Sequence, residues 1–247
     1  YEPNLFKYLK KAGYEIIWYG KNDLLAPESF KESVSEVRAS FGKGRPVKNP
    51  HKPDSPFYYS FLYDPYKDVT ESADLGRIQG AIEYIKSKPS KPFCLYLPLT
   101  EVHPPFTAPE KFYNMYSPDE IPPLRPMNLP DKPDFFEAIR RTRRLDQLDS
   151  RVFRKIQAVY LGMISYADWM LGEFINELDK SRLSENTYFF LISDHGEWGG
   201  DYGLVEKWPS ALDDTLTRIP FIVRGPECKR GHCLLYTSDA ADELDGV

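Results

Sequence analysis

The chain has 247 residues, of which 32 are Lys or Arg and 37 are Asp or Glu, so its formal net charge is −5. This balance is typical of a globular protein and excludes disordered, collagen-like and coiled-coil chains. A mildly acidic chain without long basic runs is also a poor candidate for nucleic-acid binding, and no stretch approaches the roughly 18 consecutive apolar residues of a membrane span.

The first part of the chain shows short apolar runs separated by helical patterns. Apolar side chains recur at helical spacing between Leu75 and Ile85, and either Asp68 or Thr70 is expected to cap that helix. The predicted helices cover residues 4–12, 27–37 and 75–85, and the predicted strands cover residues 14–19, 57–62 and 92–99.

The second part opens with a long Pro-rich loop, and it contains the clearest helix of the sequence. Ser150 is expected to cap that helix, and Pro220 suggests that the last strand bends or lies at an edge. The loop covers residues 100–133, the helices cover 135–148 and 151–180, and the strands cover 187–192, expected to be buried, and 219–223. Strands that alternate with helices predict an α/β fold with a mainly parallel sheet sandwiched between helices.

Three cysteines are too few for a disulfide framework. Cys94 lies in an apolar run and is expected to be a small buried hydrophobic residue. Cys228 and Cys233 form a C-x4-C pair with one histidine between them, which is a weak metal signature; a chance pairing is the favoured interpretation.

Charged and polar residues follow three of the predicted strands at the point where each strand ends. They are Lys21 after the first strand, His103 after the third, and Asp194, His195 and Lys207 after the fourth. Ligands of open α/β sheets bind beyond the carboxyl ends of the strands. We therefore expect these five residues to share one edge of the sheet.

The five residue types suit the transfer of a tetrahedral anionic group. An Asp and a His bind a divalent cation, and two lysines neutralise the oxygens of a sulfuryl or phosphoryl group. A further histidine donates a proton to a departing alkoxide. Each residue alone also has an ordinary explanation: a turn for Asp194 and His195, a solvated Lys21, an exposed His103, or a cation–π pair of Lys207 with Trp208. The prediction rests on their common edge.

Four segments resemble the sulfatases of the alkaline phosphatase superfamily. They are Gly13-Tyr14 with Gly20-Lys21, the segment PFCLYLPLTEVHPPFTAPEKF, the helix AVYLGMISYADWMLGEFI and the segment LISDHGEWGGDYGLVEKWP. The last is the most specific, because family members show a similar D-[HN]-G-x…G…K run after a buried strand. The resemblance spans nearly all of residues 4–226 and implies an alkaline phosphatase-like α/β fold.

The resemblance also implies roles for the candidate residues. Asp194 and His195 are then ligands of one divalent metal ion, calcium or manganese. Lys21 and Lys207 contact the sulfate or phosphate oxygens, and His103 lies beside the leaving-group oxygen. Family enzymes add an upstream pair of Asp ligands and a nucleophile in a Cys-x-Pro-Ser-Arg or Ser-type signature, whose cysteine becomes formylglycine.

No cysteine of this chain lies in that signature. Residues 1–226 are therefore expected to be part of a sulfatase catalytic domain whose formylglycine lies on a missing upstream residue, and to be inactive alone. Residues 227–247 do not resemble the family's continuation, and we expect a truncated or artefactual tail.

The predicted function is hydrolysis of a sulfate ester of a small molecule or glycan, without a nucleic-acid partner or a membrane span. Asp23 stands where a Gly-Lys-x-His element of the family has its histidine, and an Asp-His metal pair resembles the phosphonate monoester hydrolase branch. A phosphodiester or phosphonate monoester hydrolase is therefore the first alternative. A non-catalytic relative that binds sulfated glycans is the second.

Overall fold

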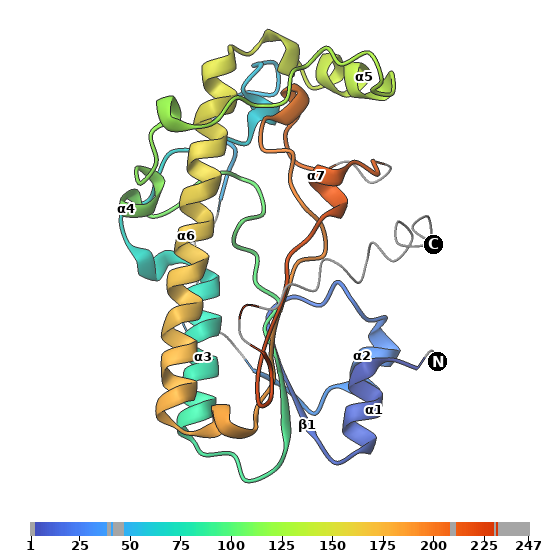
Figure 1. Cartoon of the computed structure of the whole chain (residues 1–247), viewed down its shortest axis with the longest axis vertical. Helices are drawn as coiled ribbons and strands as arrows, with labels where there is room; N and C mark the ends of the chain where they lie inside the picture. Colours follow the sequence, from blue (N-terminus) through green and yellow to red (C-terminus); the bar gives the residue numbers. More distant parts are fainter. Residues whose placement is uncertain (1–2, 39–40, 42–46, 208–210, 230, 232–247) are drawn as a thin grey trace, which may run out of the picture.

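The computed structural model describes residues 3–38, 41, 47–207, 211–229 and 231 (Figure 1). Its strands are β1 Glu15–Tyr19, β2 Glu36–Arg38, β3 Phe93–Tyr96, β4 Phe189–Ile192 and β5 Phe221–Arg224. Its α-helices are α1 Leu5–Lys11, α2 Pro27–Ser33, α3 Ala73–Lys86, α4 Glu110–Tyr113, α5 Phe135–Thr142, α6 Ser150–Lys180 and α7 Asp214–Thr217. None of the helices within these residues is both long and apolar enough to cross a bilayer.

The strands form two groups. In the first group β1 lies between β2 and β3 and pairs with both in parallel, with Ile17 opposite Glu36 on one side and Leu95 on the other. In the second group β4 and β5 pair antiparallel. The predicted parallel sheet is thus confirmed for β1 to β3, whereas the last strand runs antiparallel to its neighbour.

Strand β1 is buried on both faces, and this makes the fold a sandwich. Ile16 and Trp18 pack in the cluster formed with α1 and α2, while Ile17 and Tyr19 join the larger core of α3 and α6. Figure 1 shows α1 and α2 on one side of β1 and the long pair α3 and α6 on the other. Side chains of a strand alternate between its two faces, so a continuous apolar run fits a strand that is covered on both. The predicted α/β sandwich is confirmed.

Helix α6 is the longest element, and it carries the predicted apolar stripe against α3 and α4. Its N-cap is Asp149, whose side chain accepts the N–H of Arg151, so the prediction that Ser150 caps this helix was wrong. Ser72 caps α3, while Asp68 instead caps a short 3₁₀ turn. In both cases the helix is capped by a nearby side chain that accepts the same type of hydrogen bond.

Three predicted elements were wrong in type or extent. Within the run 57–62, Tyr58–Ser60 form a 3₁₀ turn rather than a strand, and Leu62 forms only an isolated parallel bridge with Phe106. The Ser60 hydroxyl bonds Phe57 O and Leu62 N across this turn. The helix expected over 27–37 ends at Ser33, and its end becomes β2. The helix expected over 135–148 stops at Thr142, where Arg144 adopts a positive φ of 56° before another 3₁₀ turn.

Further expectations concern the burial of β4, the cysteines and the chain end. Strand β4 is only half-buried, since Phe190 and Ile192 expose 58% and 60% of their surface. Cys94 is partly buried beside the α1 cluster, and burial raises the pKa of its thiol. Cys228 is exposed, whereas Cys233 lies outside the described residues. Of the predicted tail 227–247 the structure describes residues 227–229 and 231, so the domain boundary stays a prediction.

Helix α6 contains two glycines that test how closely α4 packs against it. A Cβ atom on Gly162 would lie 2.2 Å from the carbonyl oxygen of Phe112, while a Cβ atom on Gly172 would meet nothing within 4 Å. We expect Gly162→Ala to lower the free energy of unfolding by about 1–3 kcal/mol, because α4 must move away. Gly172→Ala is the matched control and should raise it by up to about 1 kcal/mol through helix propensity. Urea unfolding of both variants measures this, and equal shifts would contradict the packing.

Candidate active site

His103 and Lys207 meet although they lie 104 positions apart in the chain. The Nδ1 atom of His103 lies 2.7 Å from the carbonyl oxygen of Pro104. Because a carbonyl only accepts, this nitrogen carries the proton and Nε2 keeps its lone pair. Nε2 is therefore able to accept the hydrogen bond that Lys207 Nζ offers at 2.8 Å. The loop after β3 and the loop after β4 are joined at this contact.

His195 adds a second imidazole to the site. Its ring centroid lies 6.2 Å from that of His103, edge to face. Its Nδ1 donates to the carbonyl oxygen of Gly196 at 2.7 Å, which leaves Nε2 with a lone pair. The Oδ2 atom of Asp194 lies 3.6 Å from that Nε2, and the Asp194 side chain is largely exposed. Burial, reinforced by the Asp194 charge, raises the pKa of Tyr96, so this carboxylate lies near the end of β3.

Gly196 fixes the path of the chain directly after the two candidate ligands. Its N–H donates to Leu216 O at 2.7 Å, and a Cβ atom here would lie 2.0 Å from Thr215 O. Only glycine allows this approach of the backbone to α7. The Ser193 hydroxyl donates to His195 O at 2.6 Å across the same turn. His195 thus projects from a turn with little freedom.

Glu197 is a buried carboxyl group that the sequence pattern does not single out. Its Oε1 accepts the backbone N–H groups of Gly199 at 2.9 Å and of Glu206 at 2.6 Å. Burial raises the pKa of Glu197 to about 7. The residue therefore closes the loop between His195 and Lys207 from inside. An acidic residue between Gly196 and Trp198 was the available signal, but in a Gly-rich segment it is equally typical of a solvated loop.

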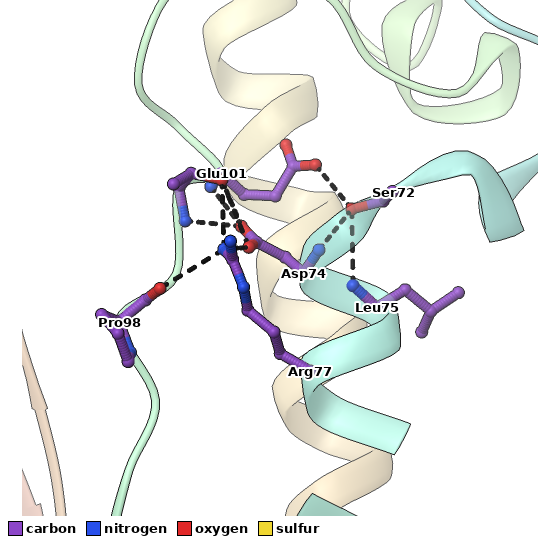
Figure 2. A network of polar contacts seen from close by, with 7 residues as sticks. Ser72, Asp74, Leu75, Arg77, Pro98 and Glu101 are labelled. Atoms are coloured by element: carbon purple, nitrogen blue, oxygen red, sulfur yellow. Dashed lines mark hydrogen bonds and ion pairs between the residues drawn. The ribbon is translucent and has the colours of Figure 1, made fainter. Parts of the chain in front are cut away.

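A second group of buried polar side chains lies under the loop that carries His103, and Figure 2 shows it. Asp74 and Arg77 of α3 form an ion pair there, and Asp74 also contacts the backbone of the loop. Glu101 accepts a hydrogen bond from Ser72 Oγ at 3.0 Å. Burial, with a contribution from the Asp74 charge, raises the pKa of Glu101 to about 7.

Lys21 lies past the end of β1, which is the neighbour of β3 in the sheet. Its Nζ forms an ion pair with Asp23 at 2.8 Å, and both side chains are about 70% exposed (69% and 70%). The structure therefore brings together His103, His195 and Lys207 with Asp194 beside them. Lys21 stands at the same end of the sheet but is engaged by its own acidic neighbour.

The two predicted metal ligands, Asp194 and His195, lie side by side. Asp194 offers carboxylate oxygens, and His195 offers a lone pair on Nε2, at an oxygen–nitrogen separation of 3.6 Å. Ligands that each lie about 2.0–2.5 Å from an ion fit that separation. Across the described part of the chain, no three His, Cys, Asp or Glu side chains gather into a metal-binding group. The donor pair fits a divalent ion as part of a ligand set rather than as a complete one.

Comparison with known proteins supports the sequence resemblance. The family model for sulfatases matches residues 1–241. The chain is 24% identical over 259 residues to choline-sulfatase of Rhizobium meliloti, which covers 96% of this chain and 50% of that protein. It is 31% identical over 160 residues to a multifunctional alkaline phosphatase superfamily protein of Trinickia caryophylli, with 58% of this chain and 30% of that protein covered.

The fold has solved counterparts as well. The phosphonate monoester hydrolase from Silicibacter pomeroyi superimposes with a TM-score of 0.64 at 19% identity, over 93% of this chain and 54% of that one. This likeness confirms the predicted alkaline phosphatase-like α/β fold. The matches span between 30% and 54% of these three relatives' lengths.

The raised pKa of Glu101 predicts a pH-dependent stability difference. Its pKa is about 7 in the folded protein against 4.5 for the free group, so the protonated form is favoured by folding. That contribution is complete below pH 4.5 and is lost as the pH rises through 7. Glu101→Gln keeps an acceptor for Ser72 and does not titrate. We expect its stability relative to wild type to increase by up to about 3 kcal/mol between pH 4.5 and pH 8.

Urea unfolding at the two pH values measures this difference. The variant Glu83→Gln, at an exposed position of helix α3, is the control and should follow the wild type at both pH values. A constant difference between Glu101→Gln and wild type would contradict the burial of a titrating carboxyl group.

Proposed function

The chain belongs to the sulfatase family, and from this premise we propose that the protein hydrolyses a sulfate monoester of a small molecule or glycan. The contact of Lys207 Nζ with His103 Nε2 at 2.8 Å is the observation that carries the proposal. It places an ammonium group and an imidazole side by side at the carboxyl end of the sheet. A sulfate ester presents there its anionic oxygens and its bridging oxygen, which need these two kinds of group.

Each side chain has a distinct task in this reaction. Lys207 donates hydrogen bonds to the non-bridging oxygens of the sulfuryl group, whose charge it partly neutralises. When the ester binds, Lys207 turns from Nε2 of His103 to the sulfuryl oxygens, and Nε2 takes up a proton from solvent. The imidazolium donates this proton to the bridging oxygen as the S–O bond breaks, which leaves His103 neutral again. The Nδ1 bond to Pro104 O keeps the imidazole oriented for this transfer.

Sulfatases generally use a divalent metal ion and a formylglycine nucleophile. Asp194 and His195 would hold the ion, either calcium or manganese, through the carboxylate oxygens and Nε2. When bound, the ion supplies positive charge that polarises the sulfate oxygens. No cysteine of this sequence lies in the nucleophile signature of the family, and the chain on its own is proposed to be inactive.

Lys21 and Asp23 bear on which anion fits. Their ion pair at 2.8 Å cancels one positive charge at this end of the site. The remaining charge suits a monoanion, such as a sulfate monoester, better than the dianion of a phosphate monoester. A phosphonate monoester or a phosphodiester is also a monoanion, so hydrolysis of these esters is the second candidate function. One relative is named a multifunctional alkaline phosphatase superfamily protein, in accord with such breadth.

Replacing His103 tests the leaving-group role. In the full-length protein, His103→Ala should lower kcat for an alkyl sulfate by about 10²–10⁴-fold, because general acid catalysis supplies that much. For 4-nitrophenyl sulfate the loss should be far smaller, since nitrophenolate leaves without a proton. Steady-state kinetics with the two substrates measures this, and equal losses would contradict the role of His103.

Replacing Lys207 tests the anion contact. Lys207→Ala should reduce kcat/KM at least tenfold for the preferred ester, because an ammonium group within reach of the transferred group is removed. Lys86→Ala is the control: Lys86 is equally a lysine but lies exposed on α3 in an i,i+3 pair with Glu83. It should leave kcat/KM unchanged.

The wild-type rates of hydrolysis of an aryl sulfate and of an aryl phosphonate decide between the two candidate functions. If the protein hydrolyses neither ester, both functions are excluded.

A further inference from the structure

Asp74 is a buried acidic residue whose contacts lead away from its own helix. It lies in the first turn of α3 with only 1% of its surface exposed. An acid at this position ordinarily serves the helix N-terminus. Here Ser72 already fulfils that task, since its Oγ accepts the N–H groups of Asp74 and Leu75. The Asp74 carboxylate is therefore free to point toward the loop after β3, as Figure 2 shows.

The carboxylate of Asp74 collects donors from that loop. Its Oδ2 accepts the backbone N–H of Thr100 at 2.6 Å and that of Glu101 at 2.5 Å. The Thr100 hydroxyl lies 3.2 Å from both carboxylate oxygens. Arg77 completes the set with an ion pair to Oδ1. Both oxygens are thus occupied, and a buried charge that is fully hydrogen-bonded holds its partners in one geometry.

The anchored residues lead directly to His103. Thr100 donates its N–H to Asp74, and its carbonyl oxygen accepts the N–H of His103 at 3.1 Å. The turn is therefore fixed on both sides of Thr100. Glu101 adds a contact from its side chain to Ser72. Between Glu101 and His103, Val102 has a positive φ of 72°, which a β-branched residue adopts only where its surroundings impose it.

We infer that Asp74 is a positioning residue for His103: its buried carboxylate clamps the turn 100–103 to the start of α3 and so sets where the imidazole meets the leaving-group oxygen. The inference rests on the proposed function for the role of His103, and on geometry alone for the clamp. Helix α3 is a rigid support, since it packs along α6 in the main core. A displacement of the turn by about 1 Å is enough to cost catalysis about 10²-fold.

Kinetics of Asp74→Asn in the full-length protein tests the link to His103. Asparagine has only one acceptor oxygen and no charge. Its NH₂ group faces either the two loop N–H groups or the Arg77 guanidinium, so the charged acceptor that holds the turn is lost in both orientations. We expect kcat for an alkyl sulfate to fall about 10–100-fold, KM to change less than threefold, and kcat for 4-nitrophenyl sulfate to fall less than threefold. Added to His103→Ala, the substitution should cost less than a further twofold.

Amide hydrogen exchange tests the clamp without any activity. In Asp74→Asn the amides of Thr100, Glu101 and His103 should exchange at least tenfold faster, while the buried centre of α6 is unchanged. Asp149→Asn is the matched control, because Asp149 also accepts one backbone N–H near a helix start but lies far along the chain at the N-cap of α6. Asparagine is an equally good N-cap, so both readouts should match wild type.

Asp74→Glu covers the case in which the asparagine variant does not fold. It keeps the negative charge and the partner Arg77 but moves the carboxylate by one methylene, so the same pattern is expected at reduced size. Equal losses with both substrates, additivity with His103→Ala, or unchanged exchange of the three amides would overturn the inference. If the wild type hydrolyses neither sulfate nor phosphonate esters, the proposed function fails, and the exchange experiment still decides whether Asp74 holds the turn.

Discussion

The burial of β1 on both faces is the constraint from which the arrangement of the site follows. Ile16 and Trp18 need the cover of α1 and α2, and Ile17 and Tyr19 need that of α3 and α6. A strand buried in this way pairs in parallel with both neighbours, and parallel strands end at one edge of the sheet. The loops after β1 and β3 therefore start from the same edge. The candidate site residues of these loops, Lys21 and His103, lie there rather than on the faces of the sheet.

The active-site loops are held by buried carboxylates as well as by apolar packing, since Trp198, Leu204 and Val205 of the loop after β4 are buried in the core. Glu197 closes the loop after β4 by accepting two backbone N–H groups, and Asp74 accepts two from the loop after β3. A loop that buries apolar side chains also buries backbone N–H groups, and these need acceptors supplied from inside. The contact between His103 and Lys207 then joins two loops that are each anchored on their own.

The sequence predicted the elements with strong periodicity and the common edge of the candidate residues. The stripe of α6 and the runs of β1 and β3 were recognised because their burial follows from local pattern alone. The run 57–62 misled because the Ser60 hydroxyl competes for the backbone, which an apolar count does not detect. Asp74 and Glu197 were missed for a related reason: an acidic side chain in a helix start or a glycine-rich loop has the same local pattern whether it is solvated or buried. Only the tertiary partners distinguish the two cases.

The buried carboxyl groups also show where stability is given up around the site. The pKa values of Glu101 and Glu197 both lie near 7, mainly because of burial, so ionising either group weakens the folded state as the pH rises. Apolar residues of similar size would avoid this loss but would leave the N–H groups of Gly199 and Glu206 without an acceptor. Fixed loops at the edge of the sheet and a core free of buried charge are thus competing demands. In this chain the loops that carry His103 and Lys207 are fixed by buried carboxyl groups, at the expense of stability at high pH.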